Sequence, residues 1–108
     1  MTGNIVILCN CGSLDEARKV AQGLVARRHA ACVNIVPGIH SIYRWQGKVE
    51  EAAEWLLIVK TQAARYAEVE ATIRELHSYT TPEVIALPIA KGLPAYLDWI
   101  LEETTPLQ

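Results

Sequence analysis

Apolar and polar positions change their period several times along the chain, and each change predicts a different secondary-structure element. Residues 4–10 form a continuous apolar run with β-branched side chains, which is typical of a central β-strand. Residues 30–45 and 48–61 are rich in Val, Ile, Tyr and Trp and predict two further strands. A fourth strand is predicted at residues 83–88, where Pro88 marks an edge strand or the end of a strand.

Two longer segments and one short segment show the period of an α-helix. Residues 13–16, Ser-Leu-Asp-Glu, form a capping-box pattern that begins the first helix. The apolar stripe of this helix consists of Ala17, Val20, Ala21, Leu24 and Val25. A second helix is predicted at residues 63–77, with an inner stripe of Tyr66, Val69, Ile73 and Leu76. A last short helix begins near residues 92–94, because Pro94 then occupies its first turn.

The second and third strands form a hairpin whose turn is predicted at Gln46-Gly47, with a β-bulge at Pro37-Gly38. Its first arm, residues 30–45, is about 50 Å long at about 3.3 Å per residue. A compact chain of this length is only about 35 Å across. The hairpin tip therefore projects, and it carries the apolar side chains Ile42, Tyr43, Trp45 and Val49. Because an exposed apolar hairpin favours pairing with another chain, we predict that the protein is not a monomer.

The order of the predicted elements is βαββαβ, followed by a terminal helix. Because βαβ crossovers are right-handed, the strands take the order 4-1-3-2, with both main helices on one face of an antiparallel sheet. The predicted fold is therefore α+β and ferredoxin-like, with a long hairpin between the second and third strands and a C-terminal helix. We expect a single domain over residues 1–108.

Composition and charge narrow the function classes. A net charge of −2 gives no basic field for a nucleic-acid backbone. No run approaches the about 20 apolar residues of a membrane span, and the first residues lack the basic segment of a signal peptide. Three cysteines cannot all pair within one chain, so we interpret them as thiols in a reducing cytosol and predict a cytoplasmic location.

The predicted topology also places the residues with reactive side chains. The end of the first strand, with Cys9 and Cys11, lies at the same end of the sheet as the loop that contains His77 and Tyr79. Cys32 begins the second strand at the opposite end, and we interpret it as a core residue. The other two histidines are predicted at the surface or in an interface between subunits: His29 and His40.

Three segments together resemble the CutA family of divalent-cation tolerance proteins: ACVNIVPGIHSIYRWQGKVE at residues 31–50, EWLLIVKT at 54–61 and HSYTTPEVIALPI at 77–89. The resemblance extends over nearly the whole chain, from Ile5 to Trp99. It implies a ferredoxin-like fold, a homotrimer held together by the long hairpins, and binding of copper or other divalent ions. It also implies overall similarity to the trimeric PII signalling proteins, which bind small ligands in clefts between subunits.

The resemblance also implies a set of metal ligands, because copper-binding members of the family use a cysteine at the end of the first strand and a pair of histidines. Cys9 matches the cysteine and His77 the second histidine, while Leu76 occupies the position of the first. Cys11 adds a second thiol on the same face as Cys9, which suits Cu(I). The alternative roles are structural: Cys9 is then a small buried hydrophobe and His77 caps the end of a helix.

A second group of residues is aromatic and polar, and it can converge on a cleft if the hairpins of neighbouring subunits wrap around each other. Its members are Tyr43, Trp45, Glu54, Lys60, Tyr79, Thr80 and Thr81. Aromatic walls, hydroxyl donors and one cation suit a small anionic or zwitterionic ligand. The alternative is that Tyr43 and Trp45 anchor the subunit interface. Because Lys60 ends an apolar run, either a carboxylate such as Glu54 or a ligand must satisfy its charge.

The residue pattern gives no support for an enzyme. The sequence has no serine-base-acid arrangement, no glycine-rich phosphate loop, and no carboxylate pair in a recognisable acid/base frame. Three functions remain open: a trimeric metal-binding protein in divalent-cation tolerance, a trimeric sensor of a small metabolite, and a structural or interaction trimer.

Overall fold

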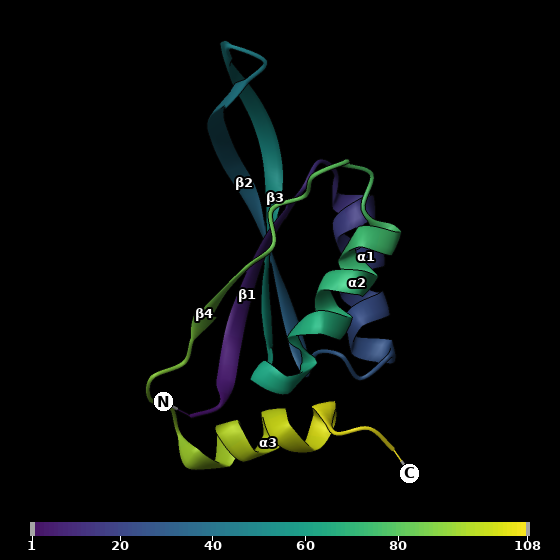
Figure 1. Cartoon of the computed structure of the whole chain (residues 1–108), viewed down its shortest axis with the longest axis vertical. Coiled ribbons are helices and arrows are strands. Elements are labelled where there is room, and N and C mark those ends of the chain that lie inside the picture. Colours follow the sequence, from purple (N-terminus) through teal and green to yellow (C-terminus); the bar gives the residue numbers. More distant parts are fainter. Residues whose placement is uncertain (1, 108) are drawn as a thin grey trace.

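The computed structural model describes residues 2–107 and contains the predicted elements in the predicted order (Figure 1). The strands are β1 (Asn4–Cys11), β2 (Cys32–Trp45), β3 (Lys48–Gln62) and β4 (Ile85–Pro88). The helices are α1 (Leu14–Ala26), α2 (Tyr66–Leu76) and α3 (Pro94–Thr104), and the short 3-10 turn η1 (Ala63–Arg65) precedes α2.

The strands form one antiparallel sheet in the order β2-β3-β1-β4, which confirms the predicted order and the ferredoxin-like fold. The register pairs Cys9 with Leu57 and Cys32 with Lys60. Since β1 and β2 both pair with β3, the end of β1 and the start of β2 lie at opposite ends of the sheet. The predicted separation of Cys32 from Cys9 and Cys11 is therefore confirmed.

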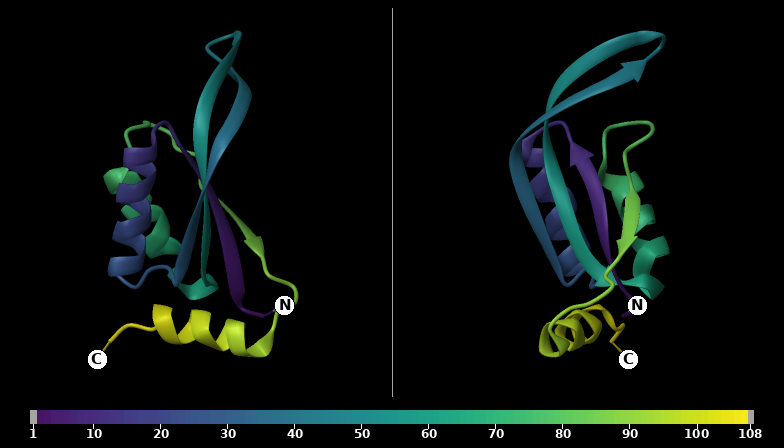
Figure 2. Two further views of the ribbon diagram at one scale, coloured as in Figure 1. Left: turned by 180° about the vertical axis from the view of Figure 1, so that it is seen from behind. Right: turned by 90° about the vertical axis from the view of Figure 1, so that its left-hand side faces the viewer.

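Helices α1 and α2 cover one face of the sheet, and the core lies between them and the inward side chains of β1 and β3 (Figures 1 and 2). Helix α1 buries Ala17, Val20, Ala21 and Leu24, and α2 buries Val69, Thr72 and Ile73. Val25 does not belong to this stripe, because it is 44% exposed. The helical step of about 100° from Leu24 turns its side chain away from the sheet.

Three elements, β2, β4 and α2, begin later in the chain than expected. Strand β2 begins at Cys32 rather than at residue 30, and β4 begins at Ile85 rather than at residue 83. Only Ile85 to Pro88 form pairs with β1, so the preceding residues after Pro82 stay in the loop. The second helix is shorter than predicted, because residues 63–65 form the 3-10 turn and His77 has an extended backbone.

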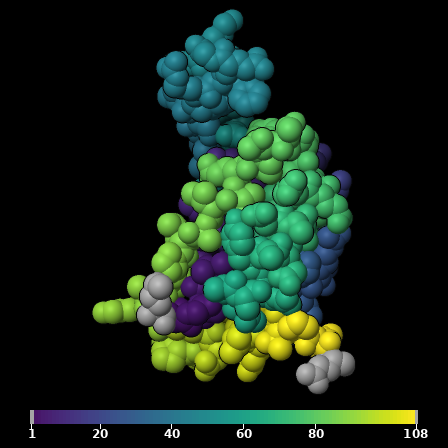
Figure 3. All heavy atoms as spheres, viewed as in Figure 1, coloured from purple at the N-terminus to yellow at the C-terminus, as the bar shows by residue number. Residues whose placement is uncertain are grey.

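The hairpin of β2 and β3 projects beyond the rest of the molecule, as predicted, and Figure 3 shows it as a separate teal lobe. Strand β1 pairs with β3 only as far as Trp55, so within residues 2–107 the hairpin tip has no third strand beside it. Gln46 and Gly47 have φ values of 51° and 79°, the positive angles that a tight hairpin turn requires. The tip side chains Ile42 and Trp45 are 67% and 57% exposed.

The predicted β-bulge lies within the hairpin. The pairing of β2 with β3 shifts between Val36 and Ile39, and Gly38 has a φ of 74°. Space is not limiting there, because a Cβ on Gly38 would meet no atom within 4 Å. The glycine is therefore required by its backbone angle alone.

Replacing Gly38 by alanine should lower the free energy of unfolding by about 1 kcal/mol, because an L-residue is strained at positive φ. Guanidinium unfolding at a fixed protein concentration measures this change. The exposed Ala53 of β3 supplies a control. Ala53→Gly should lower the free energy of unfolding by a similar amount, but through the greater chain entropy of glycine and not through backbone strain. A Gly38→Ala protein as stable as the wild type would contradict the assigned bulge geometry.

Helix α3 crosses the lower end of the sheet (Figures 1 and 2). The Asn4 amide donates to the Leu97 carbonyl at 3.4 Å, and the Gln62 amide donates to the Thr104 hydroxyl at 2.9 Å. Arg28, which follows α1, donates to the carbonyl of Glu102 at 2.7 Å and so caps the carboxyl end of α3. Among residues 2–107, no helix is long and apolar enough to cross a membrane.

The sheet face opposite α1 and α2 is largely apolar, and within residues 2–107 no helix covers it above α3 (Figure 2). The register places these side chains on that face: Val6, Leu8, Leu56, Ile58, Ile85 and Leu87. Ile85 and Leu87 are each 51% exposed. An exposed apolar surface that is continuous with an apolar hairpin indicates a protein–protein interface.

Candidate functional site

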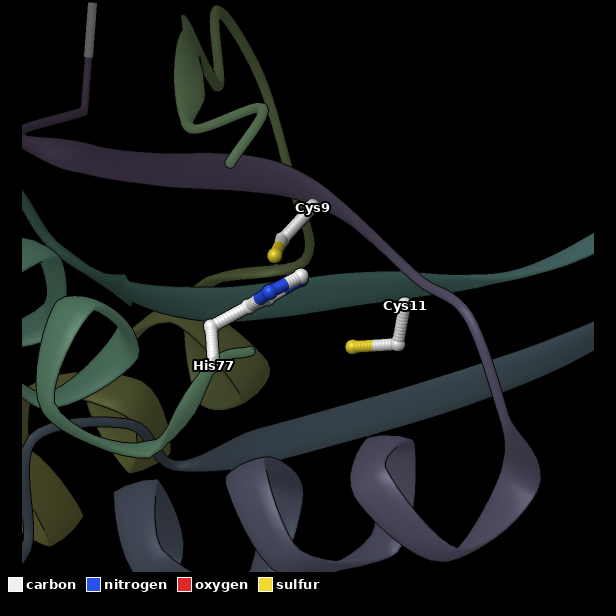
Figure 4. Close-up of side chains that lie close together, drawn as sticks. All are labelled: Cys9, Cys11 and His77. Atoms are coloured by element: carbon white, nitrogen blue, oxygen red, sulfur yellow. The ribbon is translucent and has the colours of Figure 1, made fainter. Parts of the chain in front are cut away.

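The predicted metal candidates come together at one end of the core. Cys9 and Cys11 lie on the same face of β1, because side chains alternate along a strand, and His77 is the C-cap of α2. The ligand atoms of these three residues all lie within 4.8 Å of one another. Figure 4 shows both thiols and the imidazole directed toward one another. All three residues are buried, and the two cysteines are 0% exposed.

Both ring nitrogens of His77 have hydrogen-bond partners within the chain. Nε2 donates to the carbonyl oxygen of Asn10 at 2.7 Å, and the backbone N–H of Tyr79 donates to Nδ1 at 3.1 Å. A carbonyl oxygen only accepts and a backbone N–H only donates, so the imidazole is neutral with its proton on Nε2. His77 therefore connects β1 to the loop after α2, and it must give up one of these bonds to coordinate a metal ion.

The two thiols influence each other. The hydrogen bond with Cys11, together with burial, raises the pKa of Cys9. The same hydrogen bond lowers the pKa of Cys11, against the opposing effect of burial. Cys11 is therefore the thiol that loses its proton first, and the thiolate is the form that binds soft metal ions.

A hollow of about 850 Å³ lies between the hairpin and the loop after α2. It is lined by Asn10, Ser41, Ile42, Tyr43, Trp45, Glu54, Ser78, Tyr79, Thr80, Thr81, Pro82 and Glu83. Every residue of the predicted cleft except Lys60 belongs to this lining. A single chain thus forms most of a hollow that the sequence reasoning assigned to several subunits.

Glu54 and Tyr79 join the two sides of the hollow. The Tyr79 hydroxyl donates to Oε2 of Glu54 at 2.9 Å. Burial and this hydrogen bond raise the pKa of Tyr79 to about 12. A Cβ on Gly12 would lie 2.9 Å from the Tyr79 hydroxyl oxygen, so the absence of a side chain at Gly12 leaves room for the tyrosine.

Lys60 neither reaches this hollow nor pairs with Glu54. The two residues lie on one strand, about 20 Å apart at about 3.3 Å per residue, so the alternative in which Glu54 satisfies the charge of Lys60 does not hold within one chain. The Lys60 ammonium instead lies 3.8 Å from the sulfur of its register partner Cys32. Cys32 was predicted to be a core residue, but it is partly exposed and not fully buried in the core. Without Lys60, the charged side chains that line the hollow are the carboxylates Glu54 and Glu83.

The two histidines outside the cluster take different positions. His40 is exposed on the hairpin, as predicted. His29 is partly buried, and its Nδ1 lies 2.9 Å from the Thr72 hydroxyl of α2. Burial lowers the pKa of His29. Neither histidine contributes to the cysteine cluster or to the lining of the hollow.

Sequence reasoning missed Asn10 and Glu83 as lining residues of the hollow. Asn10 lies between the two cysteines, so its side chain points to the opposite face of β1. Its Oδ1 is buried and has no hydrogen-bond partner among residues 2–107. The sequence did contain one signal, a polar residue at the end of the apolar strand β1. That signal does not show that Asn10 lines a hollow, because the hollow forms only when the hairpin lies beside it.

Comparison with known proteins gives a consistent result. The sequence profile of the CutA1 divalent ion tolerance protein matches residues 5–103. The divalent-cation tolerance protein CutA of Thermus thermophilus is 52% identical over 99 residues, which are 92% of this chain and 96% of that protein. A solved structure of the divalent cation tolerance protein from that organism has a TM-score of 0.93 at 50% identity, and the match covers 94% of this chain and 99% of that chain.

Two further relatives carry a location in their names. The structure of the periplasmic divalent cation tolerance protein CutA from Archaeoglobus fulgidus has a TM-score of 0.92 at 44% identity and covers 94% of this chain and 99% of that chain. The chloroplastic protein CutA of Arabidopsis thaliana is 42% identical over 101 residues, 94% of this chain and 56% of that protein.

These names correct the predicted cytoplasmic location. Proteins similar to this chain are named periplasmic in one organism and chloroplastic in another, so such sequences are not confined to the cytosol. The prediction was wrong because it took unpaired cysteines as a sign of a reducing compartment. Cys9 and Cys11 are fully buried and therefore shielded from oxidants in solution, so unpaired thiols at these positions do not require a reducing compartment.

Proposed function

This chain belongs to the CutA1 family of divalent ion tolerance proteins, and from that membership we propose that it is a homotrimeric tolerance protein that binds copper or another divalent metal ion. The proposed ligands are Cys9, Cys11 and His77. The proposal is supported by the convergence of their ligand atoms within 4.8 Å. We also propose that residues 1–108 form a single domain whose role is binding rather than catalysis.

The donor set fits a soft metal ion. Two sulfur ligands and one imidazole suit copper, above all Cu(I), better than they suit a hard ion such as Mg²⁺. Cys11 supplies the first thiolate, because its pKa is lowered by the hydrogen bond with Cys9. His77 must release either Asn10 or the Tyr79 N–H to coordinate, so binding requires a small rearrangement of the loop after α2.

Competition with a Cu(I) chelator tests this proposal on the protein as purified. Cys9→Ser and Cys11→Ser should each lower the affinity for Cu(I) by at least about tenfold, because even outer-shell changes at metal sites have effects of this size. Cys32→Ser is the matched control, since Cys32 lies at the other end of the sheet. An unchanged affinity in the Cys9→Ser, Cys11→Ser double variant would place copper elsewhere and remove this function.

A second candidate function is the sensing of a small metabolite, as in the trimeric PII proteins to which the resemblance to the CutA family implies an overall similarity. The observation that favours it is the hollow of about 850 Å³, whose volume lies within the range of small-molecule sites, about 300–1,000 Å³. In the proposed trimer, the hairpin of a neighbouring subunit would close this hollow. A screen of small metabolites for an increase in melting temperature tests this function, since a ligand of the folded state stabilises it.

The trimer itself is supported by two surfaces of the chain. One is the projecting hairpin, and the other is the apolar sheet face that includes Ile85 and Leu87. Contiguous exposed apolar surface of this kind is typical of a protein–protein interface.

A further inference from the structure

The hollow contains a buried carboxylate without a cationic partner. Glu54 is only 7% exposed, and within residues 2–107 no ion pair includes it. Its one hydrogen bond comes from the Tyr79 hydroxyl. A largely buried carboxylate with one donor gains from a further donor or a cation, and Oε1 of Glu54 is not among the fully buried atoms, so it is free to accept from a positively charged group in the hollow.

A second acceptor beside Glu54 also lacks a partner. The Oδ1 of Asn10 is buried and has no hydrogen bond within the described chain. Asn10 pairs with Leu56 across the ladder, and Glu54 lies two positions along β3 on the same face. Side chains in this diagonal relation are about 7–8 Å apart, so a donor group bound at Glu54 also reaches the Asn10 amide once a rotation of that side chain opens its buried Oδ1 to the hollow. Glu54 and Asn10 therefore define one binding position.

The rest of the lining is suited to the body of an organic cation. Tyr43, Trp45 and Tyr79 contribute aromatic rings, and such rings attract cations through their faces. The other charged lining residue, Glu83, is also acidic, and the lining includes no lysine or arginine. This charge disfavours the small anion that the sequence predicted and favours a cation.

An organic cation fits the hollow better than a metal ion does. Within residues 2–107, the group of residues close enough to hold a metal ion is Cys9, Cys11 and His77, which lies on the other face of β1. The volume of about 850 Å³ also exceeds the needs of a single ion and matches a small organic molecule.

We propose that this hollow binds a small organic ammonium ion, whose charged nitrogen contacts Glu54 and Asn10 and whose apolar part lies against Tyr43 and Trp45. This inference rests on the second candidate function, small-ligand sensing, and specifies the chemical class of the ligand. The proposed contact residues are distinct from the metal ligands, because the side chains of Asn10 and of the two cysteines point to opposite faces of β1.

Isothermal titration with three probes of nearly equal shape tests the charge that the hollow prefers. Tyramine carries a protonated amine, tyrosol carries a neutral hydroxyl in its place, and 4-hydroxyphenylacetate carries a carboxylate. Tyramine should bind at least about tenfold more tightly than tyrosol, because an unpaired buried carboxylate discriminates strongly for a charged donor. The carboxylate probe should not bind measurably.

Glu54→Gln is the decisive variant, because glutamine still accepts the Tyr79 hydrogen bond but carries no charge. It should remove the preference for tyramine over tyrosol. Glu51→Gln is the matched control, since Glu51 is exposed on the same strand, and it should leave the preference unchanged. Equal binding of the three probes, or an unaltered preference in Glu54→Gln, would overturn the proposal.

Two experimental outcomes distinguish an error in the proposed ligand class from an error in the sensing function. If the metabolite screen finds a ligand that is an anion and whose binding is unaffected by Glu54→Gln, the inference is wrong and sensing stands. If neither the screen nor any of the three probes shows binding, both are wrong. Copper competition at Cys9 and Cys11 is unaffected in either case.

Discussion

Replacing Leu87 by glutamate is expected to prevent assembly and to give a protein that elutes as a monomer or aggregates. Leu87 lies on the apolar sheet face and is 51% exposed in the single chain, so the substitution does little to the chain's own core. In the proposed trimer the same position is buried, and an unpaired buried carboxylate costs about 3 kcal/mol or more. Symmetry repeats this cost in each subunit, which is why the effect should be all-or-none.

Light scattering coupled to gel filtration measures the outcome. The wild-type protein should have three times the 12.0 kDa mass of one chain at micromolar concentration. Leu93→Glu is the control, because Leu93 is 71% exposed at the N-cap of α3 and belongs to no strand of the sheet, and this variant should remain a trimer. A wild-type monomer, or a fully trimeric Leu87→Glu protein, would contradict the assembly that the hairpin and the sheet face indicate.

Replacing His77 by alanine should lower the free energy of unfolding by about 3 kcal/mol or more. The substitution opens a cavity where a buried ring was, and it leaves the Asn10 carbonyl and the Tyr79 N–H without their partners. Because His77 holds the loop that lines the hollow, this loop should also become more mobile. Denaturant unfolding measures the stability, and hydrogen exchange of the Tyr79 amide reports the loop directly.

The exposed His40 supplies the matched control, since His40→Ala should change stability by less than about 0.5 kcal/mol. The comparison also separates the two roles that the sequence left open for His77. Loss of stability without any loss of copper affinity would identify His77 as a structural connector. A variant as stable as the wild type would mean that the two hydrogen bonds contribute little, and it would favour a role as a metal ligand only.

Much of the fold could be predicted from the sequence, because its signals are local. The capping box at Ser13, the turn at Gln46 and Gly47, and the bulge at Gly38 each depend on a few adjacent residues, and all are present in the structure. Strand boundaries were predicted less accurately. The residues after Glu83 favour a strand, so β4 was predicted to begin at residue 83, but only residues from Ile85 onward pair with β1. Local preference alone does not specify where pairing stops.

The sequence by itself determined the strand order, the projecting hairpin, and the approach of His77 to Cys9 and Cys11, because strand alternation and right-handed crossovers leave few arrangements. Only the tertiary structure decided the charge of the hollow. Lys60 and Glu54 are close in sequence but lie far apart along one extended strand, while Asn10 and Glu54 come together from different strands. Whether a charge is paired depends on distances across the sheet, and those distances are set by register and burial rather than by order along the chain.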